Sequence, residues 1–274
     1  MQKKHRTAVF IEAGGNKVFF ANGVLDVLYR ENIIFDKAAG FSSASPIILA
    51  YLLGLSNKAL DIFAKKLNQN KKNFYFFEAN HFPHNKIYKD SVSELIEGHP
   101  LKDIESDFVI YASQTSASWS KLKGSLASVI LLLRFGFRIN LLKYFGKAFF
   151  IKSATLTKES LLSKREVLDF IIGSSTIYPF INLYYVKGVL ILDGALLDLD
   201  YKQVLSDAQK KVIIHTEQGE TKQIGDIFHI YADKPVPSNV LDYTDGSKII
   251  ELHKLGQTVM EDTLPLLMRF LNTE

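Results

Sequence analysis

The residue with the clearest chemical setting is Ser42, in the segment Gly40-Phe41-Ser42-Ser43-Ala44. A serine between a buried strand and a helix is typical of a nucleophile elbow. Its turn is sharp, so the residues two before and two after the serine must be small, as Gly40 and Ala44 are. The turn exposes the Ser42 hydroxyl and directs the Ser43 N–H to the same point, near the positive end of the helix dipole. The alternative is a loop whose serines cap the helix.

A second segment follows the first apolar run and opens a helix: Gly14, Gly15, Asn16 and Lys17. Glycines there leave N–H groups facing outward, where they can bind a phosphate or the oxyanion of an acyl transfer. A dinucleotide-binding fingerprint needs a third glycine, but Val18 follows, and the Lys-Ser/Thr pair of a P-loop is absent. A plain tight turn is the structural alternative.

A third segment, Asp193-Gly194-Ala195, follows the extended apolar run 188–192. An acid–glycine pair after a strand is usually only a turn. A serine nucleophile needs a base, however, and none of the seven histidines sits in a convincing motif. A carboxylate at a strand end can replace histidine in that role. The histidines are His5, His81, His84, His99, His215, His229 and His253.

The elements that position these residues alternate between short apolar strands and amphipathic helices. This alternation predicts a three-layer α/β/α fold with a mostly parallel central sheet, in a single domain over residues 1–274. The predicted strands cover 7–11, 35–41, 107–113, 183–192 with a turn at 187–188, 211–216 and 226–232. The predicted helices cover 18–30, 45–53, 58–67 and 164–173, with a helical C-terminal tail over 247–271.

Residues 68–165 fit this alternation poorly, and we expect a lid or surface excursion there, with one helix near 91–96. Within it, residues 126–151 are rich in Leu, Ile and Phe and carry Arg and Lys. They predict two short helices, interrupted by Gly136 and Gly146, that lie in a membrane interface or simply cover the core. Trp119 and the aromatic cluster 74–77 are expected in the core. The basic residues of 126–151 are Arg134, Arg138, Lys143 and Lys147.

Composition bounds the function further. The chain has 274 residues, 47% hydrophobic and 23% charged, which is enough to bury a sizeable core. The lack of cysteine excludes disulfides, thiolate metal sites and cysteine catalysis, and suits a cytoplasmic location. A net charge of +4 is too weak to indicate nucleic-acid binding but suits peripheral contact with an anionic membrane. No apolar stretch approaches the roughly 18 residues that span a bilayer.

In this order the three segments resemble the patatin-like phospholipase family. That family joins a glycine-rich oxyanion loop, a Gly-x-Ser-x-Gly elbow about 25–30 residues later and a distant Asp-Gly-Gly/Ala motif. Residues 23–28 resemble part of the family's first helix, and residues 173–179 resemble the segment that precedes its aspartate motif. The resemblance covers residues 7–216 and is weak between 68 and 165.

The resemblance implies hydrolysis of a phospholipid-type acyl ester through an acyl-serine intermediate, without a metal or other cofactor. Ser42 would be the nucleophile and Asp193 the general base of a Ser–Asp dyad. Residues 14–16 would supply oxyanion donors beside the Ser43 N–H. Lys17 stands where the family carries Arg or Lys.

Three residues depart from the family pattern, because Ala13, Val18 and Ala44 stand where glycine is usual. Each adds bulk near the oxyanion hole, where the loss of one donor costs about 100- to 1,000-fold in rate. An alternative is therefore a weak or inactive patatin-like protein that binds lipid or a protein partner. A further alternative is a soluble acyltransferase or small-ester hydrolase of another α/β family with a serine elbow, which should depend on a histidine such as His215 or His253.

Overall fold

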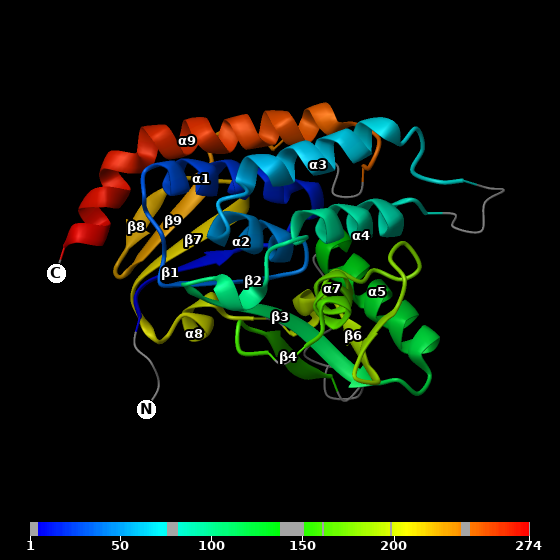
Figure 1. Ribbon diagram of the computed structural model, residues 1–274. Coiled ribbons are helices and arrows are strands. Elements are labelled where there is room, and N and C mark those ends of the chain that lie inside the picture. The colour runs from blue at the N-terminus through cyan, green and yellow to red at the C-terminus, as the bar shows by residue number, and fades with distance from the viewer. Residues whose placement is uncertain are drawn as a thin grey trace.

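The computed structural model describes residues 5–75, 82–137, 151–160, 162–197, 199–236 and 242–273. Within these residues the strands form one nine-stranded sheet in the order β5-β6-β3-β2-β1-β7-β9-β8, with β4 also paired to β3 (Figure 1). The strands are β1 (His5–Ile11), β2 (Lys37–Phe41), β3 (Asp107–Ser116), β4 (Lys152–Leu156), β5 (Tyr184–Val186), β6 (Val189–Leu192), β7 (Ala208–Gln218), β8 (Lys222–Ile224) and β9 (Ile227–Ala232).

Helices lie on both sides of the sheet. The α-helices are α1 (Val18–Arg30), α2 (Ala44–Leu52), α3 (Ser56–Gln69), α4 (His84–Leu95), α5 (Ser120–Phe137), α7 (Lys164–Gly173), α8 (Tyr201–Val204) and α9 (Gly246–Asn272). Short 3-10 helices are η1 (Gly15–Lys17), η2 (Leu101–Asp103) and η3 (Gly194–Leu197).

The centre of the sheet is parallel. Strands β3, β2, β1, β7 and β9 pair in parallel, and antiparallel pairing is confined to the two ends, where β4, β5, β6 and β8 lie. The predicted α/β fold with a mostly parallel sheet is therefore confirmed. Because β1 and β2 are parallel neighbours, with Ile11 opposite Gly40, the loops that follow them emerge side by side.

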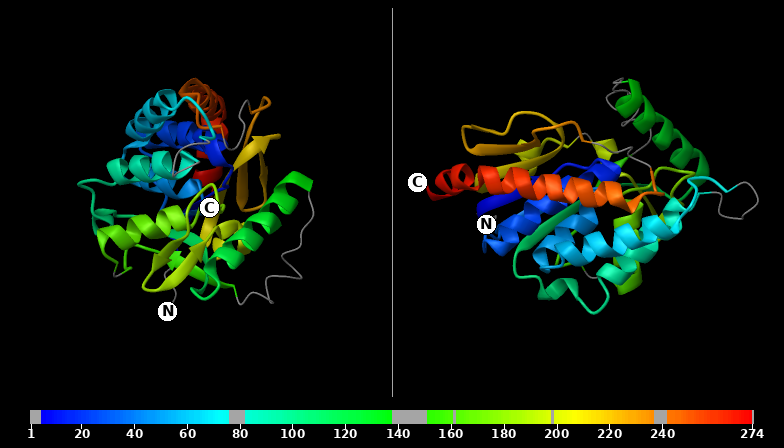
Figure 2. Two further views of the ribbon diagram at one scale, coloured as in Figure 1. Left: turned by 90° about the vertical axis from the view of Figure 1, so that its right-hand side faces the viewer. Right: turned by 90° about the horizontal axis from the view of Figure 1, so that it is seen from above.

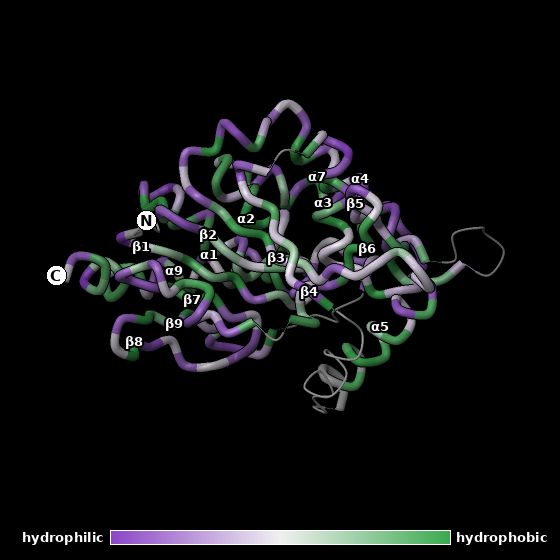
Figure 3. The backbone as a smooth tube through the Cα atoms, turned by 90° about the horizontal axis from the view of Figure 1, so that it is seen from below, coloured by the Kyte–Doolittle hydropathy of each residue, from purple (hydrophilic) through white to green (hydrophobic). Residues whose placement is uncertain are grey.

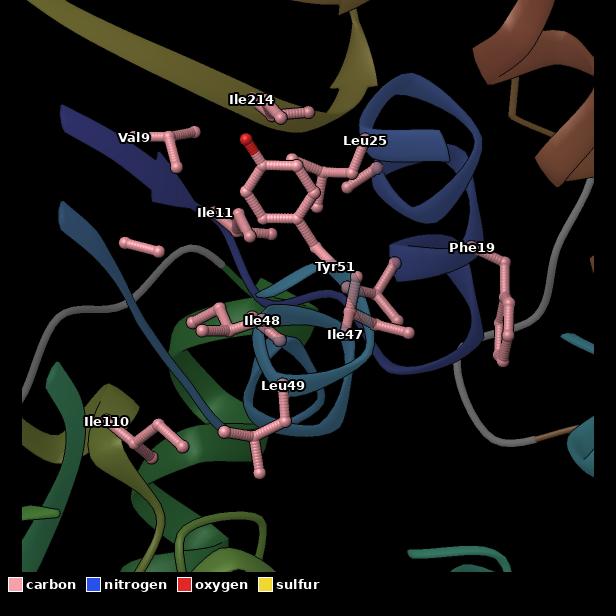
Figure 4. Packing of buried hydrophobic residues seen from close by; sticks show 14 of the residues in the cluster. Val9, Ile11, Phe19, Leu25, Ile47, Ile48, Leu49, Tyr51, Ile110 and Ile214 are labelled. Carbon is pink, nitrogen blue, oxygen red and sulfur yellow. The ribbon is translucent and has the colours of Figure 1, made fainter. Parts of the chain in front are cut away.

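One face of the sheet carries a thick helical layer. Helices α1, α2, α3 and α9 lie over it, and α9 runs along α1 (Figures 1 and 2). The contact is so close that a Cβ on Gly23 would lie 1.9 Å from the His253 carbonyl oxygen. Figure 4 shows the core beneath this layer, with Tyr51 fully buried among Ile11, Leu25 and their neighbours. The Tyr51 hydroxyl donates to the Ile33 carbonyl at 2.7 Å, which satisfies the buried polar group.

The other face is covered more thinly. Helix α8 and the end of β2 bury a small cluster that includes Phe10 and Ile213. Farther along, α5 packs against β6 and η3, with Ala127, Ile130 and Leu131 buried there. This second face therefore leaves the strand ends more accessible than the first.

Most predicted elements are confirmed, and the misses concentrate in residues 68–165. Helix α4 begins at His84, before the predicted 91–96, and packs against α3 and α7 rather than lying in a surface excursion. Helix α5 starts at Ser120 and continues to Phe137, so the predicted break at Gly136 is wrong. Trp119 is 79% exposed, which also contradicts the predicted core position. Residues 76–81 and 138–150 lie outside the described residues. They include part of the aromatic cluster 74–77 and part of the segment 126–151.

The short strands β4 and β8 are not predicted, because their residues are mostly exposed and show no buried apolar pattern. Strands β5 and β6 form the expected hairpin, and its turn residues Lys187 and Gly188 both have positive φ, 50° and 76°. Among the described residues, no helix combines the length and apolar character that crossing a membrane requires.

Candidate active site

Ser42 sits in a strained turn between β2 and α2. Strand β2 ends at Phe41 and helix α2 begins at Ala44, so the chain reverses over two residues. Ser42 has φ of 54°, in the left-handed region that side chains disfavour. The residue is only partly buried. The turn thus holds the Ser42 hydroxyl at the carboxyl edge of the parallel sheet, as predicted for an elbow.

Gly40 and Ala44, on either side of Ser42, are small for different structural reasons. A Cβ on Gly40 would lie 2.9 Å from the Ile11 carbonyl oxygen and 3.2 Å from the Ala44 Cβ, so position 40 requires glycine. Ala44 is fully buried, and its methyl group occupies the space that Gly40 leaves open. Alanine therefore fits where glycine is usual in the family.

The Ser42 hydroxyl meets Asp193, which lies 151 residues later in the chain. The Ser42 Oγ donates a hydrogen bond to Asp193 Oδ2 at 2.9 Å. The Ala195 N–H donates to the other carboxylate oxygen, Oδ1, at 2.8 Å and so helps to orient the carboxylate. Asp193 is 3% exposed. A buried carboxylate held in this way can take the hydroxyl proton when Ser42 attacks a carbonyl carbon.

The loop that carries Asp193 is packed tightly against the elbow. A Cβ on Gly194 would lie 2.5 Å from the Phe41 Cβ and 2.7 Å from the Tyr111 carbonyl oxygen, so only glycine fits. The Gly194 N–H donates to the Ser174 carbonyl at 3.2 Å. The hydroxyl of Ser174 in turn lies 3.1 Å from the Ser45 hydroxyl, in α2. The end of α7 therefore connects the aspartate loop to the elbow helix.

Tyr88 of α4 is a site residue that sequence reasoning missed. Its hydroxyl lies 3.0 Å from the Ser175 hydroxyl and 3.5 Å from the Ser42 carbonyl oxygen. Burial raises the pKa of Tyr88 well above its usual range, so the hydroxyl stays protonated. No signal in residues 68–105 indicates that this tyrosine reaches the elbow, because its partners lie on elements distant in the chain.

The loop after β1, which we call the Gly14 loop (residues 13–17), lies beside the elbow. The Gly14 N–H donates to the Ser43 hydroxyl at 3.1 Å, and the Thr216 hydroxyl donates to the Ala13 carbonyl at 3.1 Å. A Cβ on Gly14 would lie 2.6 Å from the Thr216 Oγ1, so glycine is required. Gly15 has φ of 56°. The Ser43 hydroxyl thus connects the elbow to the Gly14 loop.

The predicted oxyanion donors are not equivalent. In the described part of the chain, the N–H groups of Gly15, Asn16 and Ser43 have no hydrogen-bond acceptor, whereas that of Gly14 is engaged by Ser43. The Asn16 side chain donates to the Asp242 carbonyl at 2.5 Å and so anchors the loop to the segment before α9. Lys17 caps α1 with its backbone, and its ammonium has no ion-pair partner among the described residues.

The Val18 side chain is buried. It lines a cavity of about 20 Å³ together with Gly15, Ser43 and Tyr88, so it lies beside two of the predicted oxyanion donors. A larger cleft, of about 310 Å³, is lined by Phe41, which precedes Ser42 in the chain, and by Ala195, two residues after Asp193, among others. Its volume is in the range of small-molecule sites.

No histidine among the described residues forms a hydrogen bond to Ser42. His215 Nε2 on β7 lies 2.9 Å from His229 Nδ1 on β9, and His215 Nδ1 lies 3.0 Å from Glu12 Oε1. His253 pairs with Asn22 inside the α1–α9 contact. No cluster of potential metal ligands occurs in the described ranges.

Comparisons with known proteins give the family. The sequence profile described as "Patatin-like phospholipase" matches residues 9–199. No significantly similar sequence is found among curated proteins. Among solved structures, the chain is similar to VipD from Legionella pneumophila, with a TM-score of 0.35 and 9% identity, over 93% of this chain and 67% of that one. The profile match spans most of the chain and both segments that meet at Ser42, and the chain therefore belongs to the patatin-like phospholipase family.

Proposed function

We propose that this protein is a lipid acyl hydrolase of the phospholipase A type, a carboxylic ester hydrolase that acts through a Ser42–Asp193 dyad. The observation that carries the proposal is the 2.9 Å hydrogen bond from the Ser42 hydroxyl, on its strained elbow, to the buried Asp193 carboxylate. Membership of the patatin-like phospholipase family supports a lipid ester as substrate.

In the first half of the proposed reaction, Ser42 Oγ attacks the ester carbonyl carbon while its proton passes to Asp193 Oδ2. The carbonyl oxygen gains the negative charge, and the N–H groups of Gly15 and Ser43 are the proposed donors that stabilise it. The intermediate then collapses. The bond to the alcohol oxygen breaks, and Asp193 returns the proton to the leaving alcohol.

In the second half, water attacks the acyl-serine carbonyl, and Asp193 takes a proton from that water. Collapse of this second intermediate breaks the bond to Ser42 Oγ, which regains its proton from Asp193. The fatty acid leaves, and no metal or redox cofactor takes part in these steps. The cleft of about 310 Å³ beside Phe41 and Ala195 is the proposed place for part of the lipid substrate.

The test is covalent labelling and turnover of matched variants. We expect a fluorophosphonate probe to label the wild type but not Ser42→Ala, and phospholipid hydrolysis to fall to background in that variant. Asp193→Asn, which keeps the shape of the side chain, should reduce kcat by about 100- to 10,000-fold. Far-UV circular dichroism and thermal unfolding check that both variants fold. Full activity in either folded variant would contradict the dyad.

One contact favours the second candidate function, a weak or inactive patatin-like protein that binds lipid. The Gly14 N–H is engaged by the Ser43 hydroxyl, which leaves the Gly14 loop with one donor fewer for an oxyanion. The same labelling experiment separates the two functions. A folded wild-type protein that binds phospholipid but does not react with the fluorophosphonate supports the non-catalytic candidate.

The lipid substrate also bears on location. We propose that the protein works peripherally at a membrane surface, where phospholipid esters are presented. The cytoplasmic location and the lack of nucleic-acid partners, both inferred from composition, stay predictions.

A further inference from the structure

Positive charge is concentrated in one stretch of the chain. Residues 108–158 contain 8 Lys and Arg and no Asp or Glu, whereas the rest of the chain contains 25 basic and 29 acidic residues. The stretch therefore carries +8 and the remainder −4, although the whole chain has a net charge of only +4. Helix α5 is the main described element of this stretch.

The outer side of α5 exposes large apolar side chains, with the exposed Ser125 between them. Trp119, just before the helix, is 79% exposed, Leu122 is 60% exposed and Val129 is 48% exposed. Positions three and seven residues apart lie on one side of a helix, so Leu122 and Val129 share a face, and the exposed Lys121 lies beside it. We call Trp119, Lys121, Leu122 and Val129 the outer α5 face. Figure 3 shows that apolar residues continue along α5 at the edge of the molecule.

Trp119 is unfavourable in two ways, through its exposure to water and through its backbone conformation. It is the single tryptophan of the chain, it is the most exposed of the large hydrophobic residues described, and its φ of 58° lies in the left-handed region. With 79% of its surface exposed, the side chain projects from the helix start into solvent. Tryptophan is the residue type enriched at membrane–water interfaces, because its ring is apolar and its indole N–H is polar.

The inner side of α5 is attached to the strand and turn that flank Asp193. Ala127, Ile130 and Leu131 pack with Leu192 and Ala195, which lie immediately before and two residues after Asp193 in the chain. A helix with its side chains is about 10–12 Å across. A surface that touches the outer α5 face is thus separated from the Asp193 loop by little more than one helix. In Figure 2, α5 stands at one end of the molecule, apart from the main helical layer.

We propose that the outer α5 face docks on an anionic lipid surface and so presents membrane phospholipid to the Ser42–Asp193 pair. Charge complementarity selects this occupant, since the surrounding stretch is basic and free of acidic residues. Exposed Trp and Leu beside Lys are the combination by which peripheral helices enter an interface. The proposal rests on the lipid hydrolase function above, but docking itself requires no turnover.

The single tryptophan makes the test direct. The full chain, as wild type and as Ser42→Ala, is mixed with vesicles of phosphatidylcholine alone or of phosphatidylcholine with phosphatidylserine. We expect cosedimentation with the phosphatidylserine vesicles and a blue shift of Trp119 fluorescence there, with protection from acrylamide. Both effects should weaken at high salt, because surface charge attraction is screened.

Matched variants locate the surface. Trp119→Ala should reduce partition onto phosphatidylserine vesicles by about tenfold, and Lys121→Gln by about fivefold. The control is Ile224→Ala, which removes a 56% exposed apolar side chain from β8, at the other end of the sheet order, and should leave partition unchanged. Hydrolysis of a soluble short-chain ester should be the same in all three variants.

The outcomes separate docking from catalysis. Vesicle binding with a Trp119 shift, but without fluorophosphonate labelling, supports docking and contradicts the hydrolase function. Vesicle binding without any change in Trp119 fluorescence, or equal binding to neutral and anionic vesicles, would overturn the docking proposal. So would unchanged partition in Trp119→Ala, because that variant removes the largest and most exposed side chain of the face.

Discussion

The Ser42 elbow and the Gly14 loop follow neighbouring parallel strands and each opens a helix, yet different contacts hold them. At the elbow, a Cβ added to Gly40 would lie 2.9 Å from the backbone carbonyl oxygen of Ile11. In the loop, Gly14 faces the side chain of Thr216, and its N–H is bound to Ser43. The elbow is therefore shaped by backbone, which cannot be replaced, and the loop by side chains, which can.

This difference suggests which part of the site is adjustable. Gly40 and Gly194, beside Ser42 and Asp193, each face a backbone carbonyl oxygen, that of Ile11 and that of Tyr111, which no side-chain substitution removes. The number of N–H groups free to bind an oxyanion depends on the hydrogen bond from the Gly14 N–H to the Ser43 hydroxyl. A single substitution removes that hydrogen bond. The proposed activity is thus more open to tuning at the loop than at the elbow.

The largest effect is expected from Gly40→Ala. Its methyl group would meet the Ile11 carbonyl and Ala44, so the elbow must shift and the Ser42 hydroxyl must move away from Asp193. We expect kcat/KM on a soluble ester to fall by about 100-fold or more, with a loss of about 1–3 kcal/mol in the free energy of unfolding. Adding Ala44→Gly should not restore activity, because the Ile11 carbonyl remains. Recovery in that double variant would show that side chains, not backbone, shape the elbow.

A matched control for Gly40→Ala is Gly98→Ala. Gly98 has φ of 77° but no atom within 4 Å of a would-be Cβ, so this substitution brings backbone strain without a clash at the site. It should lower the free energy of unfolding by about 1 kcal/mol and leave kcat/KM unchanged. Denaturant unfolding and ester hydrolysis measure the two quantities on the same samples.

A smaller and reversible effect is expected from Gly14→Ala. The new methyl group would meet the Thr216 side chain, at 2.6 Å from Oγ1 and 2.9 Å from Cβ. We expect kcat/KM to fall by about tenfold or more as the loop donors move. Combination with Thr216→Gly removes both contacting atoms and should recover much of the loss, relative to Thr216→Gly alone. If the double variant stays as inactive as Gly14→Ala, the loop is not shaped by side chains.

A gain of up to about tenfold in kcat is expected from Ser43→Ala. The variant deletes the hydroxyl that accepts the Gly14 N–H, which then becomes available to an oxyanion. The loop keeps its ties to Thr216 and Asp242. Pre-steady-state hydrolysis of a p-nitrophenyl ester measures the acylation rate directly. A fall of similar size would show that Ser43 mainly holds the loop against the elbow.

The smallest effect concerns pH and the histidines beside the Gly14 loop. Burial first, and His215 next, lower the pKa of His229 below its ordinary value of 6.5. The unfolded chain therefore binds more protons than the folded one near that pH, and the stability from this group is present above about 6.5 and falls as pH drops below it. We expect the melting temperature to decline by a few degrees on acidification.

Replacement of His229 by Phe should reduce this pH dependence without changing the Ser42–Asp193 contact. Part of the slope should persist, because burial also lowers the pKa of His253 in the α1–α9 contact. Thermal unfolding across the weakly acidic range, for wild type and variant, provides the comparison. An identical slope in both would show that the histidine pair does not titrate with folding.

The strand and helix pattern was predictable wherever it was regular. Helix α1 covers the predicted 18–30, and α9 extends only slightly beyond the predicted tail, because amphipathic periodicity over many residues leaves little ambiguity. Helix α4 was placed too late, and the exposure of Trp119 was missed. Both features lie where the sequence pattern is weak. The position of α4 depends on its packing against α3 and α7, and the exposure of Trp119 depends on the direction in which α5 leaves the sheet.

The candidate site shows the same division. Local patterns of residue type and spacing establish that Ser42 follows a strand, that glycines open the loop before it and that Asp193 follows a later strand. Tertiary packing alone brings Asp193 to Ser42 across 151 residues, Tyr88 to the elbow and the Ser43 hydroxyl to the Gly14 N–H. Such contacts arise from the packing of α2, α4 and α7 around the sheet, and no local pattern encodes the position of one element against another.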